Sequence, residues 1–204
     1  VSIVVLIGAR QVGKTSIMQM LDYSPSIFLN GQDPSNILLF EKEELVEEYI
    51  RINLNKELDG YVFIDEFQYI PKISNFLKLL TDKHENLKFI CSGSSSLDIY
   101  QKVSESLAGR VRVINVFSLS YSEYLKFIDQ SLYEEYQKYT LETSFEVINP
   151  RIVIELNNYL VYGGYPRVAL VSNLEEKHEL LNYIYQTYLL RVVSSYIRNE
   201  DFLG

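Results

Sequence analysis

The stretch VSIVVLIGARQVGKTS, residues 1–16, joins a run of apolar residues directly to a loop with two glycines, a lysine and two hydroxyl groups. Its last part, GARQVGKT, matches the pattern G-x-x-x-x-G-K-[ST] at every fixed position, which are Gly8, Gly13, Lys14 and Thr15. At average glycine usage, a chance match in a chain of this length is expected in fewer than about one sequence in fifty. The stretch therefore predicts a phosphate-binding loop between a buried strand and a helix.

Each residue type in this loop suits phosphate chemistry. Glycines let backbone N–H groups approach phosphate oxygens, and the amino end of the next helix adds positive charge. Lys14 can reach the β- and γ-phosphates of a nucleotide, and the Thr15 hydroxyl can ligate Mg²⁺. The alternative is a glycine-rich turn with a solvated lysine. The residues expected to bind the nucleotide are Gly8, Ala9, Arg10, Gln11, Val12, Gly13, Lys14, Thr15 and Ser16.

An acidic pair follows a second apolar run. YVFIDE, residues 61–66, ends in Asp65 and Glu66. An acid at the end of such a strand holds Mg²⁺ in P-loop proteins, and a neighbouring acid can take a proton from an attacking water. We therefore assign Asp65, with Thr15, to the metal and Glu66 to the role of general base. Taken alone, an acidic pair at a strand end usually marks only a solvated loop, and the phosphate-binding loop is what favours the catalytic interpretation.

Two more side chains are candidates for contact with a γ-phosphate. Ser94 follows the apolar run LKFIC, so in a parallel sheet it would lie at the same edge as the phosphate-binding loop. Serines after a strand also form turns, and Ser96 suits the cap of a following helix better. Arg110 precedes the next apolar run, where it would stabilise phosphoryl charge in its own subunit or in a neighbouring one. The alternative for Arg110 is an ordinary surface arginine.

The spacing of apolar segments predicts an α/β fold. Five short apolar runs alternate with helical patterns up to residue 117, which indicates a parallel sheet. The acidic segment 41–58 predicts a helix with Leu45, Tyr49 and Ile52 facing inward. From residue 118 the pattern is helical, and Ser120 with Glu123 forms a capping-box pair. The five predicted strands are 2–7, 26–30, 61–65, 87–91 and 111–117.

Composition limits the classes of partner. The chain has 19 Lys and Arg against 27 Asp and Glu, a formal net charge of −8, which argues against broad electrostatic binding of nucleic acid. A single cysteine, Cys91, allows no internal disulfide bond, so the cytoplasm is the expected compartment. No apolar run approaches the length needed to span a membrane. Because the chain begins within a strand and ends within a helical pattern, we expect it to be part of a longer protein.

The order of the motifs resembles one protein family. GARQVGKT, YVFIDEFQYI, KFICSGSSS, SLAGRVRVINVFSLSYSEYL and YGGYPRVAL occur here in the order typical of AAA_14 proteins, bacterial and archaeal ATPases of the AAA+ superfamily. The resemblance covers essentially the whole chain. It implies a P-loop ATPase core at 1–117, with strand order 5-1-4-3-2, followed by a helical lid at 118–204. Relatives usually also carry a leading segment and a further carboxy-terminal domain.

The resemblance also implies roles for particular residues. Residues 8–15 become the Walker A loop, and Asp65 with Glu66 becomes the Walker B pair. Ser94 takes the polar sensor position and Arg110 that of an arginine finger. Arg167, after Gly163, Gly164, Tyr165 and Pro166 in the lid, becomes a second sensor, although relatives often have another residue there.

These observations predict a domain that binds ATP and Mg²⁺ and hydrolyses ATP to rearrange its lid or a partner. The alternative is a slow-turnover, nucleotide-gated interaction module, associated with DNA through Arg110 with Arg112 and Arg191 with Arg198. A small-molecule kinase is the third hypothesis. A homo-oligomer and an unknown protein client are the expected partners. A GTPase is rejected because the stretch 55–58, NKEL, lacks the acid that reads guanine.

Overall fold

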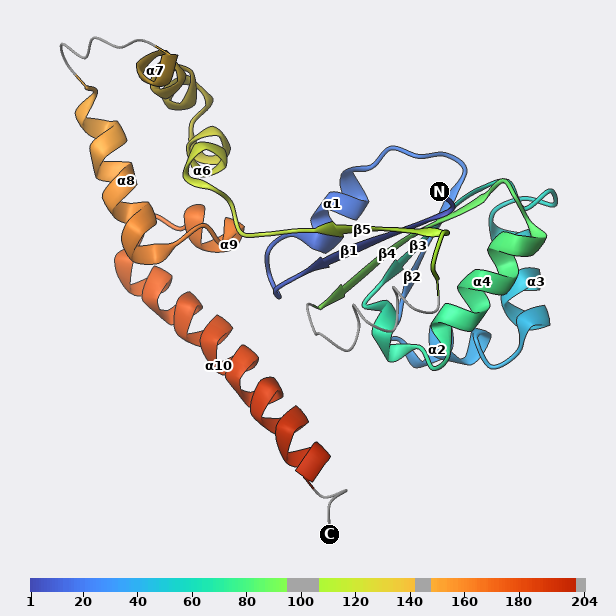
Figure 1. The fold of residues 1–204 in the computed structure, drawn as a ribbon. Coiled ribbons are helices and arrows are strands. Elements are labelled where there is room, and N and C mark those ends of the chain that lie inside the picture. The colour runs from blue at the N-terminus through green and yellow to red at the C-terminus, as the bar shows by residue number, and fades with distance from the viewer. Residues whose placement is uncertain (95–106, 142–147, 201–204) are drawn as a thin grey trace. The chain divides into compact units, whose positions relative to one another are not determined.

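The computed structural model of the 204-residue chain describes residues 1–94, 107–141 and 148–200, with side chains described up to residue 190 except at 140 and 141. Two compact units make up the chain (Figure 1). The first, here called the sheet unit, consists of Val1–Ala9 and Gly13–Val116. The second, the helical unit, consists of Phe117–Gly204 together with the loop residues Arg10–Val12.

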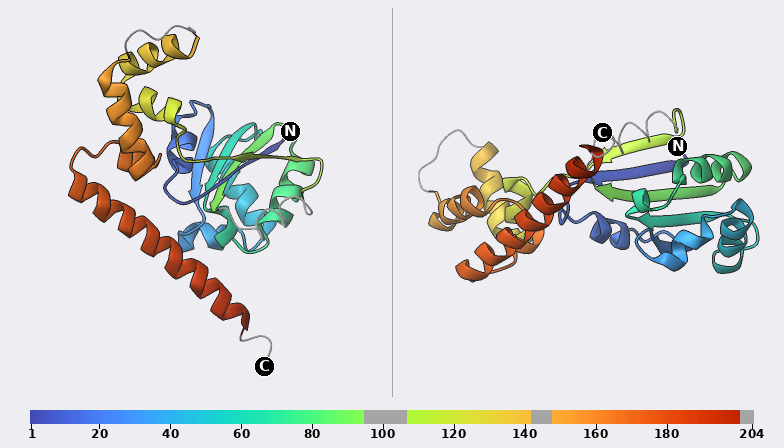
Figure 2. Two further views of the ribbon diagram at one scale, coloured as in Figure 1. Left: turned by 60° about the vertical axis from the view of Figure 1, so that its left-hand side comes forward. Right: turned by 90° about the horizontal axis from the view of Figure 1, so that it is seen from below.

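The sheet unit contains five parallel strands, in the order β2-β3-β4-β1-β5. Read from the other edge, this is the order 5-1-4-3-2 implied by the family resemblance, so the predicted fold class is confirmed. Further views of the sheet show its strands side by side (Figure 2). The strand bounds are β1 Ile3–Gly8, β2 Ser26–Asn30, β3 Gly60–Asp65, β4 Leu87–Ser94 and β5 Val111–Asn115.

Helices cover both faces of this sheet. Met18 of α1 packs with Leu6, Phe63 and Ile90 on one face, whereas α2, α3 and α4 cover the larger core on the other face (Figure 1). Because β1, β3 and β4 are covered on both sides, they read as continuous apolar runs in the sequence. The helices of this unit are α1 Lys14–Met20, α2 Pro34–Leu39, α3 Glu43–Asn53, the short 3-10 turn η1 Phe67–Tyr69, and α4 Ile73–Lys83.

One predicted helix face is wrong at two of its three residues. The acidic segment forms α3, which buries Val46 and Ile50, whereas Leu45 is 43% exposed and Ile52 73% exposed; Tyr49, the third residue expected to face inward, does pack against the core. Both faces carry branched apolar residues at helical spacing, so the periodicity alone does not select the buried one. The residues before α3 also form a separate helix, α2, because Asp33 accepts a hydrogen bond from the Ser35 N–H and Pro34 follows at the first helical position.

The helical unit has its own core, formed by α6, α7, α8 and α9 around Leu125, Leu132 and Ile152. The capping box predicted for Ser120 and Glu123 is present at the start of α6. Among the described residues, no helix is long and apolar enough to cross a bilayer. The helices of this unit are α6 Tyr121–Ile128, α7 Gln130–Leu141, α8 Pro150–Tyr162, α9 Pro166–Ala169 and α10 Leu174–Glu200.

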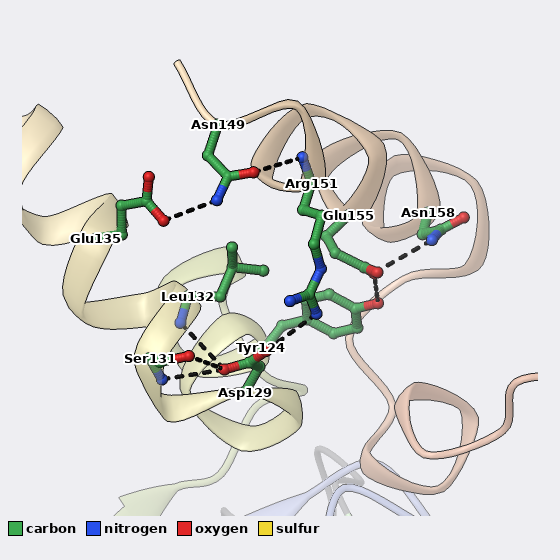
Figure 3. A network of polar contacts seen from close by, with 9 residues as sticks. All are labelled: Tyr124, Asp129, Ser131, Leu132, Glu135, Asn149, Arg151, Glu155 and Asn158. Atoms are coloured by element: carbon green, nitrogen blue, oxygen red, sulfur yellow. Dashed lines mark hydrogen bonds and ion pairs between the residues drawn. The ribbon is translucent and has the colours of Figure 1, made fainter. Parts of the chain in front are cut away.

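Tyrosine hydroxyl groups join the helices of this unit by polar contacts. The Tyr124 hydroxyl donates to Glu155 Oε2 over 2.8 Å, and Asn158 donates to the same oxygen over 3.1 Å (Figure 3). Burial, together with the hydrogen bond to Glu155, raises the pKa of Tyr124 above its ordinary value. Tyr121 and Tyr159 donate to the backbone carbonyls of residues 152 and 119. Tyr121, Tyr124 and Tyr159 therefore serve packing within this unit, and the hydroxyl group of each of the three is hydrogen-bonded.

Asp129 connects three helices. It follows α6 and accepts hydrogen bonds from the Ser131 hydroxyl, the Leu132 N–H and the Arg151 guanidinium of α8, over 2.7, 3.1 and 3.0 Å (Figure 3). These donors lower the pKa of Asp129 to about 2, mainly through the Ser131 hydroxyl. Because the folded pKa lies below the ordinary value of 3.8, this carboxylate contributes stability above that pH and loses it as the pH falls toward about 2.

We expect Asp129→Asn to lower the melting temperature at neutral pH, with the difference from the parent shrinking as the pH falls from 4 toward about 2. Asparagine keeps an oxygen that caps α7, so the loss reports the negative charge of Asp129, which strengthens the hydrogen bonds from Ser131 and Leu132 and the contact with Arg151. Thermal unfolding followed by circular dichroism over this pH range measures the difference. The exposed Asp22→Asn of the sheet unit is the control. A difference between the Asp129→Asn variant and the parent that is independent of pH would contradict the assignment.

Candidate functional site

The phosphate-binding loop leaves the sheet at the end of β1. Gly8 is the last residue of that strand and pairs with Ser94 of β4. The loop contains two residues with left-handed backbone, Gln11 with φ 63° and Gly13 with φ 99°, and α1 begins immediately afterward at Lys14. Positive φ is free of strain only for glycine, which explains the second invariant glycine of the motif. The strand–loop–helix context predicted from the sequence is therefore present.

Lys14 is held by its own loop. Its ammonium group donates to the carbonyl oxygens of Gly8 and Ala9 over 2.9 and 2.7 Å, and the residue is only 6% exposed. A buried charge needs such partners, because an uncompensated ammonium group in a protein interior is strongly unfavourable. The ammonium group therefore lies against the carbonyl oxygens at the end of β1 and the start of the loop.

Asp65 is the last residue of β3. Its carboxylate accepts more hydrogen bonds than that of Glu66, the other acid of the site. Asp65 is 8% exposed; its Oδ2 accepts from the Thr15 hydroxyl over 2.7 Å, and its Oδ1 accepts from the Ser92 hydroxyl and from the Glu66 N–H. Thr15 and Asp65 were assigned to the metal from separate motifs, 50 residues apart. The structure brings their oxygens into direct contact.

This oxygen pair suits Mg²⁺. Magnesium in proteins is usually held by one or two oxygen side chains and completes its shell with phosphate oxygens and water. Among the described residues, no group of three or more His, Cys, Asp or Glu side chains could hold a metal ion without such help. The Thr15 hydroxyl and the Asp65 carboxylate therefore fit a magnesium ion that arrives with a nucleotide, and they do not form a self-sufficient metal centre.

Glu66 occupies a constrained turn beyond the end of β3. Its backbone is left-handed, with φ 51°, and it starts the short turn η1. The loop after β2 presses against it: a Cβ added to Gly31 would lie 2.4 Å from the Glu66 carbonyl oxygen, and the Gly31 N–H donates to the Asp65 carbonyl over 2.8 Å. The backbone of Glu66 is thus fixed from the side of β2 as well as by β3.

Ser94 lies beside the loop, as expected from the parallel sheet. It is the last residue of β4, opposite Gly8, and its hydroxyl oxygen accepts a hydrogen bond from the Gln68 amide over 3.4 Å. The same amide donates to Glu66 Oε2 over 2.5 Å. Ser96, expected to cap a helix, lies outside the described residues.

The sequence places Ser92 among the hydroxyl groups at a strand end and Gln68 within the motif YVFIDEFQYI, but it does not predict their contacts with the two acids. Ser92 is fully buried within β4, where its hydroxyl contacts Asp65, and Gln68 contacts Glu66. A serine inside an otherwise apolar strand, next to the strand that carries the acid, is a signal that could have identified Ser92. Gln68 belongs to the motif YVFIDEFQYI, but its contact with Glu66 follows only from the tight turn η1.

Arg110 does not join the other site residues of its own chain. It precedes β5, and its carbonyl accepts from the N–H of Ile3 at the start of β1, five residues before Gly8. At strand geometry this places it about 16 Å from the phosphate-binding loop. Its guanidinium forms a two-point contact with Asp82 at the end of α4, over 2.6 and 3.0 Å. Arg110 is therefore not placed to act as an arginine finger on the site of its own subunit.

The roles proposed for the remaining candidate arginines stay predictions. Arg112 is exposed on β5 and Arg167 is exposed on α9. The side chains of Arg191 and Arg198 lie outside the described set, so the basic clusters considered for DNA binding stay a prediction.

The chain matches relatives over much of its length. It is 30% identical to "Uncharacterized protein MJ1544" of Methanocaldococcus jannaschii over 183 residues, which is 87% of this chain and 38% of that protein. It is 31% identical to "Uncharacterized protein Rv2008c" of Mycobacterium tuberculosis over 120 residues, 58% of this chain and 25% of that protein. The chain thus spans well under half the length of these relatives.

Solved structures and a family model give two further comparisons. "Structure of C. elegans PCH-2" matches with TM-score 0.43 and 18% identity, over 73% of this chain and 44% of that one. "Crystal structure of FIGL-1 AAA domain in complex with ADP" matches with TM-score 0.49 and 14% identity, over 82% of this chain and 57% of that one. The model of the AAA_14 family, described as an AAA domain, matches residues 1–125. The chain therefore belongs to the AAA_14 family of AAA-type P-loop domains.

Proposed function

We propose that this domain binds ATP with Mg²⁺ and hydrolyses it. The observation that carries the proposal is the 2.7 Å hydrogen bond from the Thr15 hydroxyl to Asp65. It joins the phosphate-binding loop to the acidic strand end at the place where a P-loop protein holds its metal. A glycine-rich turn with a solvated lysine would not require this contact, nor the burial of Lys14.

Binding exchanges contacts within the loop for contacts to the triphosphate. The Lys14 ammonium would leave the carbonyl oxygens of Gly8 and Ala9 and donate to β- and γ-phosphate oxygens, while backbone N–H groups of residues 9–16 donate to the remaining oxygens. Thr15 and Asp65 would hold Mg²⁺. When bound, the ion would neutralise charge that develops on the phosphate oxygens during the reaction.

Hydrolysis needs a base beside the γ-phosphate. A water oxygen attacks the γ-phosphorus, the bond from that phosphorus to the β–γ bridging oxygen breaks, and ADP and phosphate are formed. Glu66 would accept the proton that the water loses, since its carboxylate lies one residue beyond Asp65. Ser94 would contact the γ-phosphate from the end of β4. Loss of that phosphate would then rearrange the helical unit or a bound partner.

Replacement of the loop lysine tests nucleotide binding. We expect Lys14→Ala to weaken the binding of a non-hydrolysable ATP analogue by about 10- to 100-fold, because a charge-assisted hydrogen bond contributes about 1.5–3 kcal/mol. Isothermal titration calorimetry with Mg²⁺ measures the dissociation constant. Lys138→Ala, an exposed lysine of the helical unit, is the matched control. Unchanged affinity in Lys14→Ala would contradict the assignment of the site.

Replacement of the base tests the chemistry separately. We expect Glu66→Gln to bind the analogue as the parent does and to lose about 10²- to 10⁴-fold in kcat, the usual contribution of a general base. Phosphate release in single and multiple turnovers measures the rate. If Glu66→Gln turned over at the parental rate, Glu66 would not be the base.

Arg110 is proposed to act on the site of a neighbouring copy, because in its own chain it lies at the opposite end of β1. An equal mixture of Lys14→Ala and Arg110→Ala chains then contains some sites with both groups intact, and random assembly would restore about a quarter of parental turnover. Asp82→Ala separates the contact within the chain from the catalytic role, because it frees Arg110 without removing it. No recovery in a mixture shown to assemble would assign Arg110 to the ion pair with Asp82 alone.

A second candidate, a nucleotide-gated interaction module with slow turnover, is favoured by one observation. In the structure the Lys14 ammonium group is engaged by carbonyl oxygens of its own loop, which a nucleotide would have to displace. A site whose lysine is occupied in this way would need a bound partner to accelerate turnover. Turnover measured over a range of protein concentrations, with and without duplex DNA at low salt, distinguishes the two functions.

A further inference from the structure

Gln68 lies between the two side chains assigned to the reacting end of the triphosphate. Its amide nitrogen is 2.5 Å from Glu66 Oε2 and 3.4 Å from the Ser94 hydroxyl oxygen. An ionised carboxylate only accepts hydrogen bonds, so the nitrogen of the amide, and not its oxygen, must face Glu66. The two N–H bonds of one NH₂ group can therefore serve both neighbours at once.

The direction of these hydrogen bonds matters. The Ser94 oxygen accepts from Gln68, which leaves the Ser94 hydroxyl proton free to be donated to a phosphate oxygen. A hydroxyl group that donates becomes a better acceptor, because hydrogen bonds in a chain polarise one another. A phosphate bound at Ser94 would thus strengthen the hydrogen bond from the Gln68 amide to Ser94. The same amide donates the hydrogen bond to Glu66.

The backbone of Glu66 is fixed by its surroundings, so only its side chain remains to be positioned. Its backbone is fixed by the left-handed turn, by the close approach of Gly31 and by the hydrogen bond from its N–H to Asp65 Oδ1 over 3.1 Å. The Gln68 amide occupies Oε2. Within the described residues, no hydrogen bond occupies Glu66 Oε1, so this oxygen is the one available to a water molecule.

The far side of the Gln68 amide is also confined. Phe67, 2% exposed, anchors the turn in the core, and a Cβ added to Gly93 would lie 2.9 Å from Gln68 Oε1 and 2.8 Å from the Phe67 ring. Gln68 Oε1 is buried without a hydrogen-bond partner among the described residues. A buried amide oxygen left without a donor is unfavourable, so packing and the contact with Glu66 must outweigh that loss.

From this geometry we infer that Gln68 is a positioning residue, which turns the Glu66 carboxylate toward the attacking water and links its position to a γ-phosphate bound at Ser94. The inference rests on the proposed hydrolysis of ATP. It assigns no contact with substrate to Gln68, which acts only through its two neighbours.

The test removes the amide and keeps the length of the side chain. We expect Gln68→Met to lower kcat about 10- to 100-fold, because misplacing a catalytic group by about 1 Å has an effect of that size. Its dissociation constant for a non-hydrolysable ATP analogue and its melting temperature should stay close to those of the parent. Gln32→Met, an exposed glutamine in the loop after β2, is the matched control and should change neither quantity.

A double variant separates positioning from a general structural effect. Because Gln68 acts through Glu66, adding Gln68→Met to Glu66→Gln should lower kcat no further, whereas independent effects would multiply. A second substitution, Gln68→Glu, places a carboxylate against Glu66 and should lower kcat and destabilise the fold through like-charge repulsion. In the exchanged variant Glu66→Gln with Gln68→Glu, the amide–carboxylate pair is restored, so stability should recover while turnover does not.

The outcomes distinguish this inference from the proposed function. A parent protein that binds ATP but never hydrolyses it, alone or assembled, overturns both. An active parent whose kcat survives Gln68→Met overturns the inference alone. Multiplied losses in the double variant also overturn it, because Gln68 would then act by a route other than Glu66. Loss of nucleotide affinity in Gln68→Met, in proportion to the loss of kcat, would instead make Gln68 part of the binding surface and contradict the positioning role.

Discussion

The parallel register of three strands is the constraint on which the site depends. Because β1, β3 and β4 run in the same direction, their carboxyl ends meet at one edge of the sheet, where Gly8 lies opposite Ser94. Asp65, at the end of β3, contacts Ser92 on the adjacent β4 and also Thr15 in the helix that follows β1, one strand further along the sheet. A one-residue slip between these strands would turn Asp65 or Ser92 to the other face of the sheet and break the contacts.

The sequence predicts this edge well because its signals are local and redundant. Buried strands of a doubly covered sheet are continuous apolar runs, and each one here ends in glycine, acid or serine, so both the elements and the polar residues that follow them can be identified. The buried face of α3 could not be identified, since Val46 with Ile50 and Leu45 with Ile52 offer equivalent apolar faces. The contacts of Gln68 could not be predicted either, because they depend on a 3-10 turn and on the packing of Phe67.

Arg110 shows why position along a strand matters as much as residue type. Its sequence context, just before β5, is compatible with a phosphoryl contact, but a parallel strand carries its first residue to the edge opposite the phosphate-binding loop. The guanidinium finds an aspartate there, Asp82, and forms an exposed ion pair. Such a pair usually contributes little to stability, so it is weak competition for a stronger anion. The same placement that removes Arg110 from its own site leaves it available at the molecular surface.

The polar groups of the site are largely paired within the chain, and this determines what a nucleotide must do. Lys14 binds two carbonyl oxygens, Asp65 accepts from three donors and Glu66 accepts from Gln68. A ligand therefore gains only the difference between its own contacts and those it replaces. For Lys14, exchange of neutral carbonyl oxygens for phosphate oxygens would be favourable, because the ammonium group would then face a charged acceptor in place of a neutral one. For Glu66 no such gain is available from an anion, so a γ-phosphate would have to act on it through neutral groups, and an amide with two N–H bonds would meet that requirement.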